Sequence, residues 1–389
     1  MKKTLIAILL ATFASTGFAQ LDNPNANVDW LTGKVEEGNR IISTGVPLLL
    51  IAPDSRAGAM GDVGAASKPD ANSIHWNAAK LSFMEKQAGL TFTYSPWLRE
   101  IVSDIKLMYL SAYYRLDERN TLGASLTYFS LGSIDFFSED GQQTGTYKPN
   151  EFAFDVAYSM KLSENLSMSL TGRYIRSDLT QGQNVGTTST HAANAGAADL
   201  GLYYQNKINL EMPSEYAFVV QISNLGSKIS YSDNMESSFL PANLRIGGRY
   251  SMDFDQFNNL SVMADFNKLL VPTPPVYDGE GNIFAGKDPN VGVLQGAIQS
   301  FYDAPNGFKE ELQEISMSLG LEYWYNKILA VRAGYFYEAK NKGARKYLTL
   351  GAGLRYNVMG LDISYLISTS ALNNNPLKNT LRVSLSFDL

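Results

Sequence analysis

The most constraining feature of this sequence is a two-residue alternation of apolar and polar side chains, which returns in one short segment after another from Gly89 to the C-terminus. Successive side chains of a β-strand point to opposite faces, so each such segment predicts a strand with one apolar face and one polar or small face. In the last segment the apolar positions are Leu381, Val383, Leu385, Phe387 and Leu389.

The alternation predicts an all-β fold with about fourteen antiparallel strands. We expect strands at residues 89–95, 105–115, 121–130, 152–161, 166–176, 197–205, 215–223, 243–251, 259–267, 316–325, 329–337, 347–356, 361–368 and 380–389. Two architectures fit such a set: a transmembrane β-barrel and a soluble β-sandwich.

The connections between these strands favour the barrel. Every second connection is long: residues 96–104, 131–151, 177–196, 224–242, 268–315, 338–346 and 369–379. Those between them are mostly short: residues 116–120, 162–165, 206–214, 252–258, 326–328 and 357–360. Outer-membrane barrels have long extracellular loops and short periplasmic turns, whereas a sandwich has no reason to separate them. Both ends of the mature chain are then expected on the short-turn side.

The N-terminus predicts export. Lys2 and Lys3 precede an apolar run and a small-residue stretch that ends at Ala19, which is typical of a cleaved signal peptide over residues 1–19. The longest later apolar stretch, residues 46–52, is too short for a membrane-spanning helix. The chain has no cysteine and a net charge of −6, which excludes disulfides and disfavours nucleic acid as a partner.

Residues 20–88 precede the first strand and are expected to include a plug inside the barrel of residues 89–389. Residues 57–66 consist mostly of small side chains, with glycines at Gly58, Gly61 and Gly64. Small residues allow the close backbone approach that a crowded lumen demands. The glycines lack the preceding strand and the Lys-Ser/Thr pair of a phosphate-binding loop.

Nothing in the sequence predicts a catalytic, cofactor or metal site. The two histidines, His75 and His191, are the only candidate bases for a hydrolase, and no Gly-x-Ser-x-Gly or His-Glu-x-x-His motif accompanies them. A lipid-facing charge in a strand is costly, so strand arginines are expected to point into the lumen and join lumenal acids in a polar network. These arginines are Arg173, Arg245, Arg249, Arg332, Arg355 and Arg382.

Several runs resemble the PorV family of the type IX secretion system, outer-membrane proteins similar to FadL-type fatty acid transporters. The runs lie at residues 44–47, 51–62, 70–73, 76–81, 94–98, 126–132 and 162–165. The resemblance implies a fourteen-stranded barrel in the bacterial outer membrane, with a hatch that includes Gly58, Gly61, Gly64, Asn77 and Leu81. One departure is Asn77-Ala78-Ala79, where FadL-type hatches usually carry Asn-Pro-Ala.

The same resemblance implies a function in protein transport. Such proteins bind the C-terminal signal domains of secreted cargo at a large translocon barrel, and deliver them to a cell-surface attachment complex with a sortase-like protease; lipopolysaccharide surrounds them. Two alternatives stay open: a FadL-like channel for hydrophobic small molecules, and a lipid A O-deacylase or a factor required for one.

Long outer loops are where we expect partners to bind, because exposed aromatic side chains often anchor protein interfaces. Within the longest loop, residues 293–302 and 308–314 are expected to form short helices with apolar faces. The aromatic candidates are Phe136, Phe137, Tyr147, Tyr231, Phe239, Tyr277, Phe301 and Tyr302.

Overall fold

The computed structural model describes residues 28–29, 34–35, 39–96, 104–137, 143–182, 189–209, 211–233, 236–369 and 380–389. The predicted signal peptide and most of the loop at residues 369–379 lie outside the described residues. So do the side chains of Phe136 and Phe137, although their backbone lies in a described strand.

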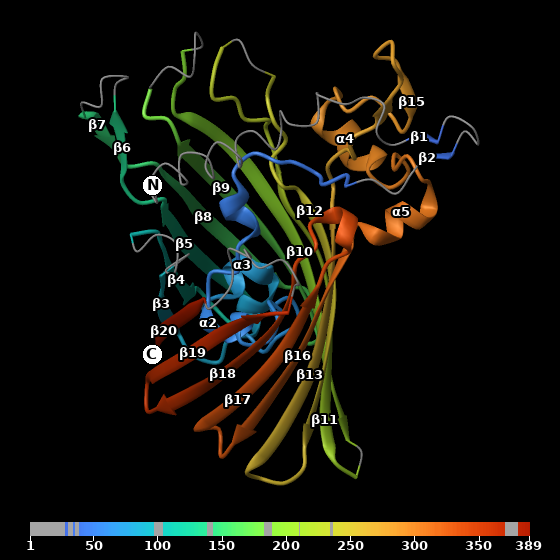
Figure 1. Ribbon diagram of the computed structural model, residues 1–389. Coiled ribbons are helices and arrows are strands. Elements are labelled where there is room, and N and C mark those ends of the chain that lie inside the picture. The colour runs from blue at the N-terminus through green and yellow to red at the C-terminus, as the bar shows by residue number, and fades with distance from the viewer. Residues whose placement is uncertain are drawn as a thin grey trace.

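The described residues form a closed antiparallel barrel of fourteen strands, shown in Figure 1. The strands are β3 (Ala88–Pro96), β4 (Lys106–Arg115), β5 (Asn120–Ser130), β8 (Asn150–Lys161), β9 (Leu166–Asp178), β10 (Ala193–Asn209), β11 (Pro213–Gly226), β12 (Asn243–Asp253), β13 (Asn258–Leu269), β16 (Ile315–Tyr325), β17 (Leu329–Tyr337), β18 (Lys346–Tyr356), β19 (Met359–Ser368) and β20 (Leu381–Asp388). The last strand pairs with the first and closes the barrel. The predicted fold class and strand set are confirmed; β10 begins and ends four residues beyond the predicted segment.

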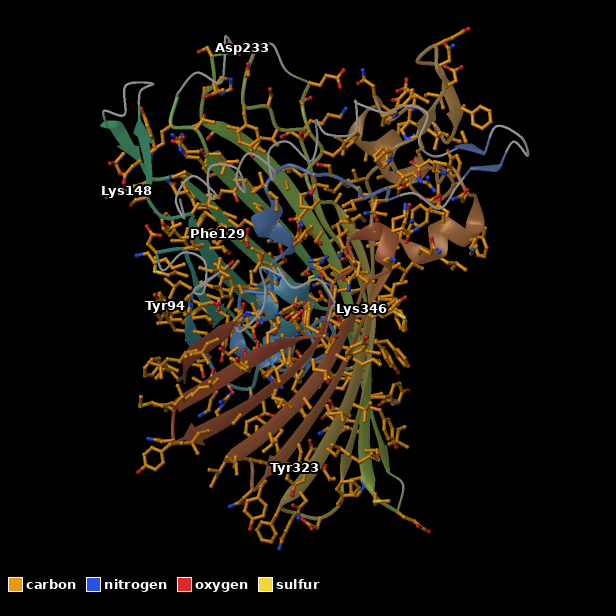
Figure 2. The ribbon with its side chains drawn as sticks, viewed as in Figure 1. Tyr94, Phe129, Lys148, Asp233, Tyr323 and Lys346 are labelled. Carbon is orange, nitrogen blue, oxygen red and sulfur yellow. The ribbon has the colours of Figure 1, made fainter. Side chains whose placement is uncertain are left out.

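Alternation along each strand separates the two faces of the wall. On β16, Met317, Leu319 and Leu321 are exposed on the outside, while Ser318 and Glu322 are buried toward the lumen. Figure 2 shows outward side chains over the whole wall, with Tyr94 and Tyr323 labelled among them. A continuous exposed apolar surface of this extent is stable in lipid rather than in water. None of the described helices is long and apolar enough to cross a membrane.

Long connections gather at one end of the barrel and carry small elements of their own. Two hairpins are formed by β6 (Ile134–Phe137) with β7 (Gln143–Tyr147), and by β14 (Val276–Tyr277) with β15 (Ile283–Ala285). Also at this end are β1 (Val28–Asp29), β2 (Lys34–Val35), α4 (Val293–Gln299), α5 (Phe308–Gln313) and η3 (Lys340–Lys342), as Figure 1 shows. The two short helices confirm the prediction made for the longest loop.

The described N-terminal segment corrects one expectation. The C-terminus lies at the short-turn end, where Leu389 exchanges backbone hydrogen bonds with Ala88. Residues 39–50 instead lie at the long-loop end: the amide of Arg40 donates to the carbonyl of Asn341, and that of Gly45 to Phe239. The chain therefore enters the barrel from the long-loop end before β3 begins at the other end.

Inside the barrel, residues 45–85 form the expected plug. Its elements are η1 (Pro47–Leu50), α2 (Ser55–Gly58), α3 (Ser73–Asn77) and η2 (Ala78–Phe83), seen within the wall in Figure 1. The wall accommodates it through glycines: a Cβ at Gly334 would overlap the backbone of Met60, and one at Gly351 would overlap the Cβ of Ala59. No side chain fits at these contacts, so the wall sequence is matched to the plug.

Candidate functional site

Charged side chains join the plug to the wall across the lumen. Arg56 of α2 donates two hydrogen bonds to Glu322 of β16, at 2.8 and 2.9 Å, and a third to Asp70 at 2.8 Å. Arg332 donates to the same Glu322 at 2.7 Å and continues the network to Asp362, also at 2.7 Å. We call Asp70, Arg56, Glu322, Arg332 and Asp362 the lumenal network.

The six arginines that the sequence analysis assigned to the lumen, Arg173, Arg245, Arg249, Arg332, Arg355 and Arg382, all point into it, as predicted. Arg173 is held between Asp155 and Asp199, and Arg249 contacts Glu215 and the carbonyl of Ala66. The remaining partners are Asn267 and the Trp76 carbonyl for Arg245, Glu322 and Asp362 for Arg332, Asp362 for Arg355 and Asp62 for Arg382. Buried charges in such pairs fill space that an apolar conduit would need.

The three plug glycines are sites of close approach. A Cβ at Gly58 would overlap the guanidinium of Arg382, and one at Gly64 would overlap the ring of Trp76. Gly61 adopts φ +68° against the backbone of Tyr335, a conformation that side-chain-bearing residues rarely adopt. Their role in this structure is packing between the plug and the wall.

Asn77 and Leu81 fix the last part of the plug to the wall. The Asn77 side chain donates to the carbonyl of Leu202 at 3.0 Å and accepts from the amide of Ala79 at 3.1 Å. Leu81 is fully buried and lies against Gly123. The Asn77 carboxamide thus links η2 directly to β10.

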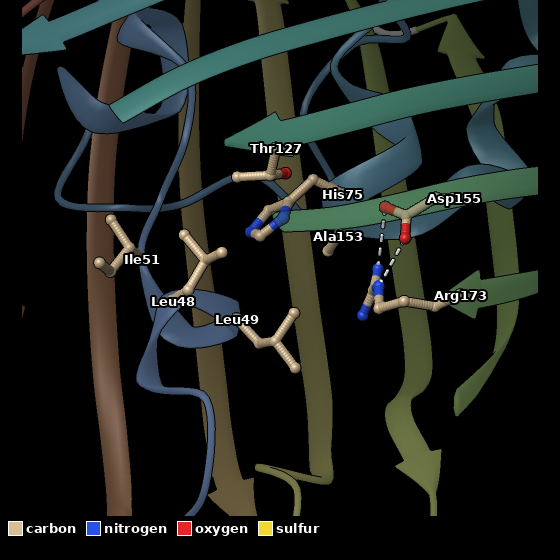
Figure 3. Close-up of a pocket in the computed structure, with 8 residues that line it drawn as sticks. All are labelled: Leu48, Leu49, Ile51, His75, Thr127, Ala153, Asp155 and Arg173. Atoms are coloured by element: carbon tan, nitrogen blue, oxygen red, sulfur yellow. Dashed lines mark hydrogen bonds and ion pairs between the residues drawn. The ribbon is translucent and has the colours of Figure 1, made fainter. Parts of the chain in front are cut away.

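The two candidate bases lie far apart in the fold. His75 of α3 lines a cavity of 10 Å³, shown in Figure 3, together with Leu48, Leu49, Ile51, Thr127, Ala153, Asp155 and Arg173. Burial, with Arg245 and Arg173 nearby, lowers the pKa of His75 well below its usual value. His191 is exposed on an outer loop, 3.5 Å from Asp233. The cavity beside His75 has room for about one water molecule but not for an acyl chain.

A second buried network lies under the longest loop at the outer rim of the barrel. Glu310 of α5 accepts from Arg40 at 2.7 and 2.8 Å and from Lys342 at 2.7 Å. Glu314 accepts from Lys342 and from Lys268, which also donates to Glu311. We call Arg40, Lys268, Glu310, Glu311, Glu314 and Lys342 the rim network.

The rim network sets the protonation of the acids around it. Burial alone would raise the pKa of Glu310, but hydrogen bonds from Arg40 and Lys342 outweigh burial and lower its pKa to about 2. Neighbouring Asp303 shows the reverse: burial, with Glu311 and Glu314 nearby, raises its pKa to about 6 despite a hydrogen bond from the amide of Thr273. The site thus favours the charged form of the Glu310 carboxylate and disfavours that of Asp303.

Both loop helices bury polar side chains and expose apolar ones, which is the reverse of an ordinary surface helix. In α5 the acids Glu310 and Glu311 are buried, whereas Phe308 and Leu312 are 75% and 53% exposed. In α4, Gln299 is buried and donates to the carbonyl of Asp288, whereas Leu294 and Ile298 are 68% and 66% exposed. Polar contacts hold these helices, to the rim network in α5 and within the loop in α4, and apolar side chains face outward.

Exposed apolar side chains of the longest loop, apart from α5, make up what we call the outer-loop surface: Tyr277, Ile283, Phe284, Leu294, Ile298, Phe301 and Tyr302. Three of them were aromatic candidates from the sequence. Leu294 and Ile298 were missed, because their spacing of four residues predicts an apolar face but not whether that face points inward or outward.

The other aromatic candidates lie in different surroundings. Tyr147 and Phe239 are half-buried, and the ammonium of Lys228 lies 4.2 Å from the Phe239 ring centre. Tyr231 packs against the apolar cluster below the loops and donates a hydrogen bond to Ser177 at 3.0 Å. Phe136 and Phe137 belong to β6.

Comparisons with known proteins identify the relatives of this architecture. The sequence model of one family, described as "Type IX secretion system protein PorV", matches residues 34–276, more than half of the chain. No curated protein matches by sequence.

Solved structures with a similar chain course include the Pseudomonas putida toluene transporter TodX, with 14% identity, a TM-score of 0.48, and coverage of 87% of this chain and 98% of that one. They also include a Pseudomonas aeruginosa FadL homologue, with 11% identity and a TM-score of 0.45. The match covers 90% of this chain and 100% of the homologue.

Proposed function

Because this chain belongs to the PorV family of type IX secretion system proteins, β-barrels of the bacterial outer membrane, we propose that its outer loops bind secreted cargo. The bound element is the C-terminal signal domain, taken up at the translocon barrel and carried to the cell-surface attachment complex. The observation that supports this most is the outer-loop surface, whose apolar side chains are held outward on a rigid base.

Rigidity is what turns exposed apolar area into a useful interface. A flexible loop loses conformational entropy when a partner orders it, whereas a preorganised one avoids that cost. Buried ion pairs from Arg40, Lys268 and Lys342 fix α5, and Gln299 fixes the end of α4. Aromatic and aliphatic anchors on such a base are typical of interface hot spots.

The lumen argues against a channel for hydrophobic molecules as the main function. Such a channel requires a continuous apolar path, but the plug lies in the lumen and the charged lumenal network joins it to β16, β17 and β19. Deacylation of lipid A by this chain has little support either, since Asp155 beside His75 is already engaged by Arg173. If the purified protein released ester-linked acyl chains with His75 and His191 both replaced, neither histidine would be the base.

The test uses matched substitutions on α4. The double substitution Leu294→Glu and Ile298→Lys removes two apolar anchors without changing the net charge. Glutamate near the N-terminus of α4 and lysine near its C-terminus both interact favourably with the helix dipole. Gln295→Glu is the control, because Gln295 is an exposed polar neighbour on the same helix. We expect the double variant to lose cargo in co-purification from gently solubilised membranes, while Gln295→Glu retains it. Normal capture by the double variant would refute the assignment.

A further inference from the structure

The apolar face of α5 lies near the edge of the lipid-facing wall. This position supports an inference about α5 that does not depend on cargo binding. Phe266, Met317 and Tyr337 are exposed on the outside of β13, β16 and β17, and they are direct cross-strand partners near the outer ends of these strands. Leu312 precedes Met317 by five residues, so the chain separates them by at most about 18 Å. The apolar face of α5 therefore lies close to the outer edge of the lipid-facing surface.

Orientation of α5 is fixed by the rim network rather than by its own apolar residues. Glu310 and Glu311 are held against the barrel by Arg40, Lys342 and Lys268. Figure 1 shows α5 at the side of the barrel near the outer ends of the strands, with α4 above it. The outward face of α5 is thus directed to the side of the barrel, where the outer leaflet begins.

Lysines near α5 suit the headgroup region. Lys309 and Lys340 are exposed, and Lys340 lies in η3, whose Lys342 is paired with Glu310. Lys346 opens β18 with its ammonium 4.7 Å from the ring centre of Tyr337. Aromatic rings with nearby lysines are typical of a membrane interface, and cationic side chains attract anionic headgroups.

We propose that α5 is an interfacial helix, which lays Phe308 and Leu312 into the outer leaflet while the nearby Lys340 contacts anionic lipid headgroups. The helix is short, so its affinity alone is small. Its effect comes from being tethered to the barrel, where it fixes the height of the longest loop above the membrane. In this arrangement α5 binds lipid and α4 stays in water, free for a protein partner.

The chain contains no cysteine, so single-cysteine variants give clean labelling. Leu312→Cys and the α4 control Leu294→Cys are labelled with an environment-sensitive fluorophore and reconstituted into vesicles of phosphatidylcholine and phosphatidylglycerol. Lipids spin-labelled high in the acyl chain report contact with the leaflet, and iodide reports contact with water. Phe308→Cys provides a second position on the same face.

At Leu312 and Phe308 we expect several-fold stronger quenching by spin-labelled lipid than at Leu294, and weaker quenching by iodide. Equal quenching at all three positions by both agents would overturn the proposal and leave α5 as part of the protein-binding surface. Heat-modifiable migration of each variant in detergent confirms that the barrel is folded, so every readout refers to the native protein. Removing phosphatidylglycerol should reduce the lipid quenching if Lys340 contacts anionic headgroups.

Discussion

Arg40 and Glu310, 270 residues apart in sequence, form a buried two-bond ion pair at 2.7 and 2.8 Å. Arg40 lies on the segment that leads into the plug, and Glu310 lies on α5 of the longest loop. Removing one partner of a buried pair leaves an uncompensated charge, which costs about 3 to 5 kcal/mol. The plug segment and the loop therefore stabilise each other through this contact.

Breaking the pair should release the loop but not the barrel. We expect Arg40→Met to make residues 268–315 more sensitive to protease and faster in amide hydrogen exchange, with heat-modifiable migration retained. The control is Asp233→Asn, which breaks the exposed contact with His191, where little stability is at stake. Unchanged loop protection in Arg40→Met would show that the rim network does not hold the loop.

Acid should weaken loop docking through Glu310. Its pKa falls from 4.5 in the released loop to about 2 when docked, so the docked state binds fewer protons. The stabilisation is therefore complete above about pH 4.5 and is lost as the pH falls toward 2. Hydrogen exchange of residues 308–313 between pH 5 and pH 2 measures this, and Glu310→Gln should flatten the dependence. A wild-type profile that is already flat would contradict the ion-pair account.

Asp303 makes the opposite contribution. Its pKa is raised from 3.8 to about 6, so its stabilising contribution is present below about pH 3.8 and lost as the pH rises through 6. One carboxylate oxygen accepts from Thr273, and the other has no hydrogen-bond partner among the described residues. We expect Asp303→Asn to protect the loop above pH 6 and to leave it unchanged near pH 4, as measured by the same hydrogen exchange. Faster hydrogen exchange of the loop in Asp303→Asn than in the wild type at pH 7 would contradict a destabilising Asp303 carboxylate.

Close packing between wall and plug gives a stability prediction with a matched control. A Cβ at Gly334 would overlap the backbone of Met60, whereas one at Gly172 would meet nothing within 4 Å. Gly334→Ala should lower the free energy of unfolding in urea by about 1 to 3 kcal/mol. Gly172→Ala should leave it unchanged or raise it slightly. Equal stability of the two variants would contradict the close seating of the plug against β17.

The strands and the plug were predictable from sequence because both leave local signals. Period-two alternation marks a strand wherever one face is apolar, and it placed all fourteen within a few residues of their observed ends. Clustered small residues around Gly58 and Gly61 marked the plug. The lumenal direction of the arginines followed from the cost of a charge in lipid.

Site details were less predictable, because they depend on contacts between distant segments. No local pattern relates Arg40 to Glu310, or indicates that α5 is anchored by its acids. The same four-residue spacing in Leu294 and Ile298 would describe a helix packed inward. The sequence also did not predict that the plug enters from the long-loop end, because the contact between Gly45 and Phe239 joins segments that are far apart in the sequence.

The most direct test of cargo binding by the outer-loop surface is site-specific photocrosslinking in living cells. A photoreactive amino acid at Leu294 is compared with one at Leu170, which is exposed on the lipid-facing wall of β9. We predict a covalent adduct between position 294 and the C-terminal domain of a secreted cargo protein, and none from position 170. Absence of that adduct at 294, or equal yield from both positions, would contradict the account.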